Sequence, residues 1–158
     1  MRIRVVVADQ SEARYYSLER LGGPLRLVGR TLDPQARLHE RDLVSDRPGR
    51  IFNSARLSGK RRGSVAHHGT GGEKSARKTE AERFARRITG ELDAERREGS
   101  YDRLVLMCPP GFLGLLRGTM TKSLHKSVVV EVAKDLVRCS DKVIGSHVPA
   151  DAFELLSS

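Results

Sequence analysis

The apolar residues near the amino terminus fall in three short runs that are separated by polar turns. Residues Ile3–Ala8 are rich in β-branched side chains and stop at the polar turn Asp9–Glu12, which predicts a strand. Further strands are predicted over Ala13–Arg20 and Leu25–Thr31, and the Leu21-Gly22-Gly23-Pro24 sequence between them indicates a turn. Because such short connections join antiparallel neighbours, we expect a three-stranded meander.

Helical spacing of apolar residues begins near residue 79. Thr79 and Glu82 fit a capping box, in which the threonine is the N-cap and the glutamate reaches back to its backbone. Gly99 is placed to end the helix. The predicted core face consists of Ala81, Phe84, Ala85, Ile88 and Leu92, and the polar face includes Arg83, Arg86 and Arg87.

Two more strands and two more helices are predicted in the rest of the chain. Arg103–Cys108 is a nearly continuous apolar run, which is typical of a strand buried on both faces. Ser127–Val132 predicts a second buried strand, and Pro149 opens a short terminal helix. Between the two strands, Pro109-Pro110-Gly111 leads into a helix with the core positions Phe112, Leu113, Leu116, Met120 and Leu124.

This order of elements predicts one α/β domain, residues 1–158, with a mixed five-stranded sheet flanked by helices. A three-stranded antiparallel meander comes first, and two parallel strands follow through crossover connections. Ribonuclease-H-like domains have this order, and so does the central domain of archaeal and eukaryotic class-one release factors. A fold does not identify a function, so particular residues have to indicate the chemistry.

The positive charge of the chain is concentrated in one region. The 158 residues include 29 Lys plus Arg and 20 Asp plus Glu, for a formal net charge of +9, and ten basic but three acidic residues stand between residues 56 and 87. Residues 33–78 show no sustained apolar period, so we expect a long, basic, glycine-rich excursion that is partly flexible. Such a field favours a polyanionic partner, nucleic acid before membrane. The alternative is a solvated basic face that keeps the protein soluble.

The apolar runs and the cysteines indicate a cytoplasmic protein. The longest uninterrupted apolar run is Leu104–Cys108, far shorter than the roughly 18 residues that a membrane-spanning helix needs. Asp9 interrupts the apolar run at the amino terminus where a signal peptide would continue. Cys108 and Cys139 form no CxxC motif and are too few for a disulfide framework. We therefore expect a reduced cytosolic protein without membrane insertion.

Candidate catalytic residues are few. A ribonuclease-H-like nuclease needs clustered carboxylates for two metal ions, and Asp9 with Glu80 or Glu82 could supply two of them. A cysteine and two prolines stand where the fourth strand would supply the third, so we interpret Asp9 as a turn-forming residue. The adjacent His67 and His68 lack the ligand spacing of a zinc site. The sequence therefore assigns no catalytic residue, metal ligand or cofactor.

The glycine-rich part of the excursion is predicted to contact phosphates. Gly71 and Gly72 allow backbone N–H groups to approach a ligand closely, and neighbouring bases can hold its phosphates. The Gly69–Glu73 segment resembles the Gly-Gly-Gln loop of the release-factor central domain, with Glu73 in place of the glutamine. The predicted nucleic-acid-binding residues are Lys60, Arg61, Arg62, Gly71, Gly72, Lys74, Arg77, Lys78, Arg47 and Arg50.

Several sequence blocks resemble the bacterial host attachment protein family. They span nearly the whole chain and are Arg37–Arg50, Ala81–Ala85, Tyr101–Leu106, Pro110–Arg117 and Lys134–Leu136. The most specific block contains the family-motif residues Arg41, Asp42, Asp46, Arg47, Pro48, Gly49 and Arg50. The resemblance implies a requirement in attachment to plant host cells and a relation to the release-factor central domain.

Two interpretations of the family motif stay open. Asp46 could pair with Arg47 or Arg50 and hold an irregular loop against the sheet. The two arginines could instead be presented to phosphates, which a guanidinium binds in bidentate fashion.

The leading hypothesis is a cytosolic, non-catalytic RNA-binding domain that docks on the ribosome or on tRNA. One alternative is an enzyme, either a peptidyl-tRNA hydrolase acting through Gly71–Glu73 or a metal-dependent nuclease acting through Asp9. A second alternative is a protein-interaction module that affects envelope biogenesis and host attachment. The sequence predicts no particular oligomeric state.

Overall fold

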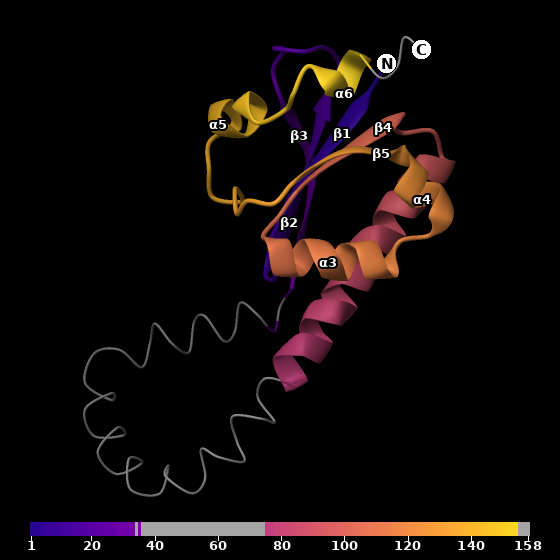
Figure 1. The fold of residues 1–158 in the computed structure, drawn as a ribbon, viewed down its shortest axis with the longest axis vertical. Helices are drawn as coiled ribbons and strands as arrows, with labels where there is room; N and C mark the ends of the chain where they lie inside the picture. Colours follow the sequence, from indigo (N-terminus) through magenta and orange to yellow (C-terminus); the bar gives the residue numbers. More distant parts are fainter. Residues whose placement is uncertain (34, 36–74, 155–158) are drawn as a thin grey trace, which may run out of the picture.

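The computed structural model of the 158-residue chain describes residues 1–33, 35 and 75–154. Its centre is a five-stranded sheet with the strand order β3-β2-β1-β4-β5 (Figure 1). β1, β2 and β3 form an antiparallel meander, β4 is parallel to β1, and β5 is parallel to β4. This arrangement confirms the predicted α/β class and mixed sheet. The strands are β1 (Ile3–Ala8), β2 (Glu12–Leu18), β3 (Arg26–Leu32), β4 (Arg103–Met107) and β5 (Val128–Val132).

One carboxylate organises the turn between β1 and β2. Asp9 Oδ1 accepts hydrogen bonds from the backbone N–H groups of Ser11 and Glu12, at 2.8 and 2.9 Å. It also accepts a hydrogen bond from the Ser11 hydroxyl at 2.9 Å. An aspartate that binds the backbone two residues further on stabilises a tight turn. The interpretation of Asp9 as a turn-forming residue is therefore confirmed.

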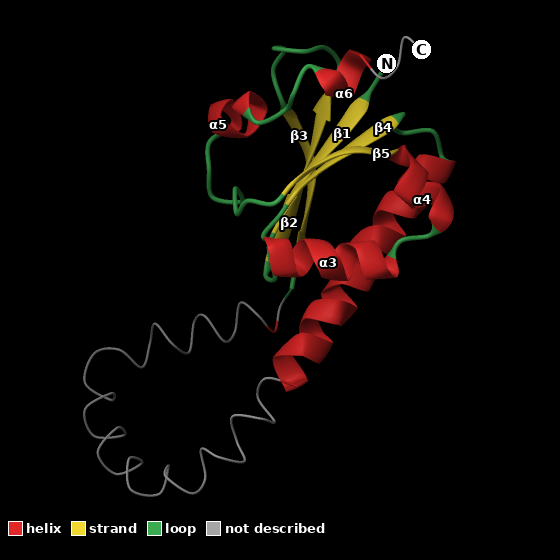
Figure 2. Ribbon diagram, viewed as in Figure 1, coloured by secondary structure: helices red, strands yellow, loops and turns green. Residues whose placement is uncertain are grey.

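Each face of the sheet has its own hydrophobic core, and Figure 2 shows helices on both faces. The first core lies under the long helix of residues 75–97, α3 (Pro110–Thr119) and α4 (Lys122–Ser127). The second lies under the chain after β5, which includes α5 (Asp141–Ser146) and α6 (Asp151–Glu154). Because alternate residues of a strand point to opposite faces, β1 and β4 contribute to both cores. Burial of apolar surface on both sides of these strands is the main term that stabilises the fold.

The long helix begins earlier than its sequence pattern predicts. Residues 75–78, the last four of the predicted excursion, are already helical. The Thr79 hydroxyl donates to the Ser75 carbonyl at 2.9 Å, one turn back in the same helix. The predicted N-cap at Thr79 is therefore wrong, because a threonine hydroxyl inside a helix bonds the carbonyl four residues earlier.

The carboxyl end of the long helix is where the sequence predicts it. The backbone N–H of Gly99 donates to the Arg96 carbonyl at 3.0 Å, and that of Ser100 donates to the Glu95 carbonyl at 3.0 Å. Gly99 has φ +78°, and this combination is a Schellman motif, which requires a left-handed residue after the helix.

The segment between β4 and β5 differs from the single predicted helix. α3 ends at Thr119, and Met120 is extended, with φ −77° and ψ 143°. A second helix, α4, starts after Thr121, whose side chain accepts a hydrogen bond from the Leu124 N–H at 3.1 Å. The apolar spacing from Phe112 to Leu124 continues across this break, because both helices face the same core.

One further expectation needs correction, and one helix was not predicted. β5 is half-buried rather than buried on both faces, because it is the edge strand beside β4. α5 is not among the predicted helices, and the side chain of its N-cap residue Ser140 accepts a hydrogen bond from the Val143 N–H at 3.3 Å. The turn that Pro149 opens is present and leads into α6.

Arg4 of β1 connects the sheet to the carboxyl-terminal half of the long helix. Its guanidinium forms an ion pair with Glu95 and lies over the Tyr101 ring, 5.3 Å from the ring centroid. The Tyr101 hydroxyl donates to the Leu92 carbonyl at 2.7 Å. The Arg4 side chain is 9% exposed, and a buried charge is costly unless it is paired. This contact therefore favours one position of the helix on the sheet.

Replacing Gly99 by alanine is expected to destabilise the protein by about 1–2 kcal/mol, because alanine pays a steric penalty at positive φ. The matched control is Gly90→Ala, in the exposed middle of the same helix, where an added Cβ meets nothing within 4 Å. We expect this control to stabilise by up to about 1 kcal/mol. Urea unfolding with an unchanged m-value measures both effects, and equal shifts of the two variants would contradict the role of Gly99.

Candidate nucleic-acid interface

Two of the ten predicted nucleic-acid-binding residues lie in the part of the chain that the structure describes. Arg77 and Lys78 are in the first turns of the long helix, and both side chains are exposed. The other eight lie outside the described residues and are Arg47, Arg50, Lys60, Arg61, Arg62, Gly71, Gly72 and Lys74. The remaining family-motif residues lie outside them as well, namely Arg41, Asp42, Asp46, Pro48 and Gly49.

The amino end of the long helix projects beyond the packed body of the domain (Figure 1). Residues 75–79 are exposed, and Ala81 is the first residue of the helix that is buried. We call residues 75–80 the projecting end. At 1.5 Å per residue, this segment is about 9 Å long. Arg77 and Lys78 therefore lie on a part of the helix that solvent reaches from most directions.

Two further arginines continue this cationic surface onto the packed part of the helix. Arg83 and Arg86 are exposed, and neither has an ion pair with any residue that the structure describes. Arg87 is engaged differently, because its Nε contacts Glu91 at 3.4 Å and its Nη1 donates to the Leu32 carbonyl at 3.4 Å. The sequence places Arg83 and Arg86 on the polar face of the helix, and their spacing of three residues indicates one common surface.

A partly buried polar cluster attaches the middle of the helix to β2 and β3. The Thr31 hydroxyl donates to Glu91 Oε2 at 2.8 Å, and the Tyr15 hydroxyl donates to the same oxygen at 3.2 Å. Tyr15 and Thr31 are 5% exposed each. Burial raises the pKa of Tyr15; the hydrogen bond with Thr31 opposes this shift, and the negative charge of Glu91 adds to it.

The end of β3 lies beside the start of β2, and the excursion follows it in the sequence. The Asp33 backbone N–H donates to the Ser11 carbonyl at 2.9 Å, which continues the pairing of β3 with the start of β2. Glu12 lies beside it between two arginines, 2.7 Å from Arg30 Nη2 and 3.0 Å from Arg14 Nε. Burial alone would raise the pKa of Glu12, but the hydrogen bonds and charges of Arg30 and Arg14 outweigh it, so the pKa is lowered.

Three other features concern the Cys108 thiol, metal ligands and membrane-spanning helices. Cys108 is 1% exposed, and burial raises the pKa of its thiol to about 12, so it is a small core residue. Within residues 1–33, 35 and 75–154, no group of three or more His, Cys, Asp or Glu side chains could hold a metal ion. None of the helices described is long and apolar enough to cross a bilayer.

Comparison with known proteins places the chain in a family. A family model described as "Protein required for attachment to host cells" matches residues 4–148. The chain belongs to this host-attachment family. The match extends from β1 to the residue before Pro149, so it includes all five strands, the long helix and the excursion.

Comparison with individual proteins adds less. No curated protein matches this chain. A solved structure titled "Archaeal protein" is similar, with 13% sequence identity and a TM-score of 0.42. The alignment covers 99% of this chain and 38% of that one, so the chain spans well under half of that protein's length.

Replacing Glu12 by glutamine is expected to lower the free energy of unfolding at pH 7 by about 1–2 kcal/mol, because both arginines lose a charged partner. The folded-state pKa of Glu12 lies below its ordinary value of 4.5. Its stabilisation is therefore complete above that pH and is lost as the pH falls through the folded-state pKa.

Urea unfolding between pH 7 and pH 3 should therefore show a smaller difference between wild type and Glu12→Gln at the acid end. Glu19→Gln, at an exposed carboxylate beyond the end of β2, is the control and should change little at either pH. A constant difference between wild type and Glu12→Gln over the whole pH range would contradict the proposed pairing.

Proposed function

We propose that this host-attachment family protein is a non-catalytic RNA-binding domain that contacts the phosphate backbone of ribosomal RNA or tRNA. The cationic surface consists of the projecting end of the long helix, Arg83 and Arg86 beside it, and the basic segment that precedes the helix. The single observation that carries the proposal is that Arg77, Lys78, Arg83 and Arg86 are exposed along one helix end. Their charges are thus available to a partner.

The charges of the two contributing segments have the same sign. Residues 75–87 contain five basic and two acidic residues, and residues 36–74 contain nine basic and four acidic residues. Residues 36–74 directly precede the projecting end in the sequence, so the two basic segments are continuous along the chain. Neutralising phosphates with such a surface releases counterions from the nucleic acid, and this release drives binding.

The helix gives its arginines a defined spacing. Arg83 and Arg86 are anchored through the buried face of the same helix, where Phe84, Ala85 and Ile88 are each at most 4% exposed. A guanidinium on a packed helix loses less conformational freedom on binding than one on an unstructured chain. The planar guanidinium also matches the geometry of a phosphate, which it binds with two hydrogen bonds.

A relation to the release-factor central domain remains part of this proposal. The basis is the order of elements, together with Gly71 and Gly72 between the meander and a basic helix. Glu73 stands where that loop has a glutamine and adds a negative charge where RNA phosphates would lie, so we propose binding without peptide release. Attachment to host cells, which the family description names, would then follow indirectly from an effect on RNA or ribosomes.

The double variant Arg83→Ala/Arg86→Ala is expected to weaken RNA binding and to reduce the slope of log K against log salt by about 1.4–1.8. Alanine is the best helix former, so the helix itself should remain. Fluorescence anisotropy with a labelled RNA hairpin at several salt concentrations measures the slope.

The matched control is Lys134→Ala/Lys142→Ala, which removes two exposed charges on the α5 side of the domain. Both double variants lower the net charge equally, so only a local phosphate contact distinguishes them. Equal loss of affinity in the two variants would contradict the proposed location of the RNA-binding surface. The absence of RNA binding by the wild type would contradict the proposed function.

The predicted phosphate contacts of the basic residues in the excursion can be tested in the same assay. If about five basic side chains contact phosphates, the slope of log K against log salt for the wild type should be near −3.5 to −4.5. Lys60→Ala/Arg61→Ala/Arg62→Ala should flatten the slope by about 2–3, since each lost contact releases one counterion fewer. Unchanged affinity and slope in this triple variant would remove these three residues from the interface.

A further inference from the structure

The edge of the sheet at β3 exposes apolar side chains. β3 pairs with β2 and has no second neighbouring strand among the described residues. Leu27, Val28 and Leu32 of this strand are 49%, 45% and 37% exposed. They are three of the six large hydrophobic residues that are exposed in the described part of the chain. Exposed apolar side chains on an edge strand indicate a surface that can pair with another chain.

The backbone of β3 has hydrogen-bonding groups on the same edge. The Asp33 N–H donates to the Ser11 carbonyl at 2.9 Å, so the backbone of Asp33 faces β2. Residues alternate in an antiparallel ladder, and Leu32 and Arg30 therefore direct their N–H and C=O groups away from β2. The Leu32 carbonyl accepts a hydrogen bond from Arg87 Nη1 at 3.4 Å. The part of the edge that remains open to a partner therefore extends from Arg30 toward the start of the strand.

The charge of this edge indicates the kind of partner. β3 contains Arg26 and Arg30 and no acidic residue. Arg30 pairs with Glu12, whereas Arg26 has no ion pair among the described residues. A hollow of about 300 Å³ at the start of β3 is lined by Arg26 and Arg20, with Glu19 as its only carboxylate. This local excess of positive charge is complementary to acidic side chains.

Two other occupants fit the edge less well. A second copy of the chain would bring the same arginine-bearing strand against itself, and the net charge of +9 opposes self-association. The phosphates of RNA would match the arginines, but a nucleic acid has no peptide groups that could pair with the edge of a strand. A peptide segment with acidic side chains satisfies both the charge and the backbone groups.

We propose that the β3 edge binds an extended acidic segment of a partner protein, which adds to the sheet as a sixth strand. Arg26 lies opposite Ser17 and Leu27 opposite Tyr16, so the two side chains point to opposite faces of the sheet. The segment therefore alternates acidic residues, which contact Arg26, with apolar residues, which cover Leu27. Backbone hydrogen bonds supply affinity in this mode of recognition, and the alternating side chains supply specificity.

A titration of the full chain with a synthetic peptide that alternates valine and glutamate tests the proposal. Arg26→Glu is expected to weaken binding at least tenfold, as measured by two-dimensional NMR of the amides. The matched control is Lys122→Glu, at an exposed lysine of α4, and it should bind as the wild type does. A peptide that alternates valine and lysine should bind Arg26→Glu better than the wild type. Thermal unfolding of each variant without peptide establishes that it is folded.

Amide hydrogen exchange measures the strand pairing itself. The Arg30 N–H should exchange at least tenfold more slowly when the valine–glutamate peptide is bound, because it gains an acceptor. The Thr31 N–H already faces β2 and should be unaffected by the peptide. A peptide with serine in place of valine should bind more weakly, because it leaves Leu27 and Val28 exposed to water.

The outcomes that overturn the proposal are distinct. The absence of peptide binding by the wild type overturns it, and so does binding without slower exchange of the Arg30 N–H. Slower exchange on raising the protein concentration without peptide would assign the edge to a second copy. Weaker binding of an RNA hairpin by Arg26→Glu but not by Lys122→Glu would assign it to RNA. Arg83→Ala/Arg86→Ala should leave peptide binding unchanged, so the β3 edge and the proposed RNA-binding surface can fail separately.

Discussion

The packing of the long helix against the sheet is the contact on which the rest of the structure depends. Ile88 and Leu92 are fully buried in the first core, and polar contacts on each side of them position the helix. Glu91 receives hydrogen bonds from β2 and β3, and Glu95 pairs with Arg4 of β1. Apolar burial supplies most of the stability, whereas these polar contacts favour one register, because any other would leave the buried Arg4 guanidinium without its partner.

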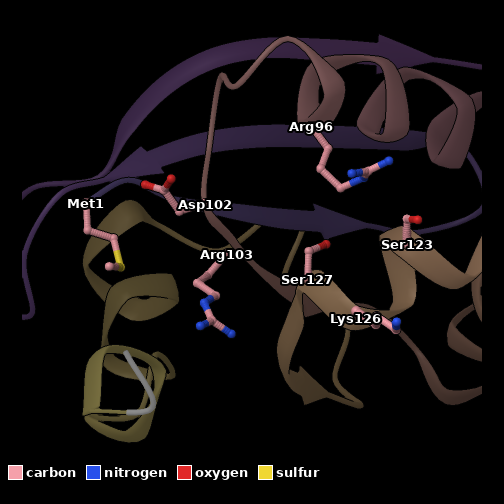
Figure 3. Close-up of a pocket in the computed structure, with 7 residues that line it drawn as sticks. All are labelled: Met1, Arg96, Asp102, Arg103, Ser123, Lys126 and Ser127. Carbon is pink, nitrogen blue, oxygen red and sulfur yellow. The ribbon is translucent and has the colours of Figure 1, made fainter. Parts of the chain in front are cut away.

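This packing separates two surfaces of the same sign. The helix lies across the sheet; its amino end carries Arg77 and Lys78 beyond the core, and Arg83 and Arg86 are exposed on the packed part beside them. Its carboxyl end brings Arg96 to the same open depression that Arg103 of β4 and Lys126 of α4 border (Figure 3). Arg83 and Arg96 are 13 residues apart in this helix, which corresponds to about 20 Å. At physiological salt, charges at this distance are screened from one another, because the Debye length is about 8 Å. The two groups of charges are therefore only weakly coupled electrostatically.

The pattern of apolar and polar residues is sufficient to predict most strands of the sheet. It is less informative about the helices that cover the sheet. β-branched runs and short turns predict β1 to β3, because local spacing decides both pairing and direction in a meander. Helix boundaries depend on hydrogen bonds that periodicity does not include. Thr79 has the composition of an N-cap but bonds Ser75, and Met120 interrupts an apolar spacing that continues into α4. α5 is too short to show a period, and its position comes from packing against the second core.

The sequence by itself determined the fold class, the turn at Asp9, the helix end at Gly99 and the concentration of positive charge. These features are local, because each depends on residues within a few positions of one another. Only the tertiary structure decided which cations remain unpaired and which of them share a surface. Arg103 and Lys126 are 23 positions apart in the chain, and they border one open depression because the β4–α4 connection folds back beside the long helix. Ion pairing and surface shape depend on such long-range packing, which residue spacing alone does not encode.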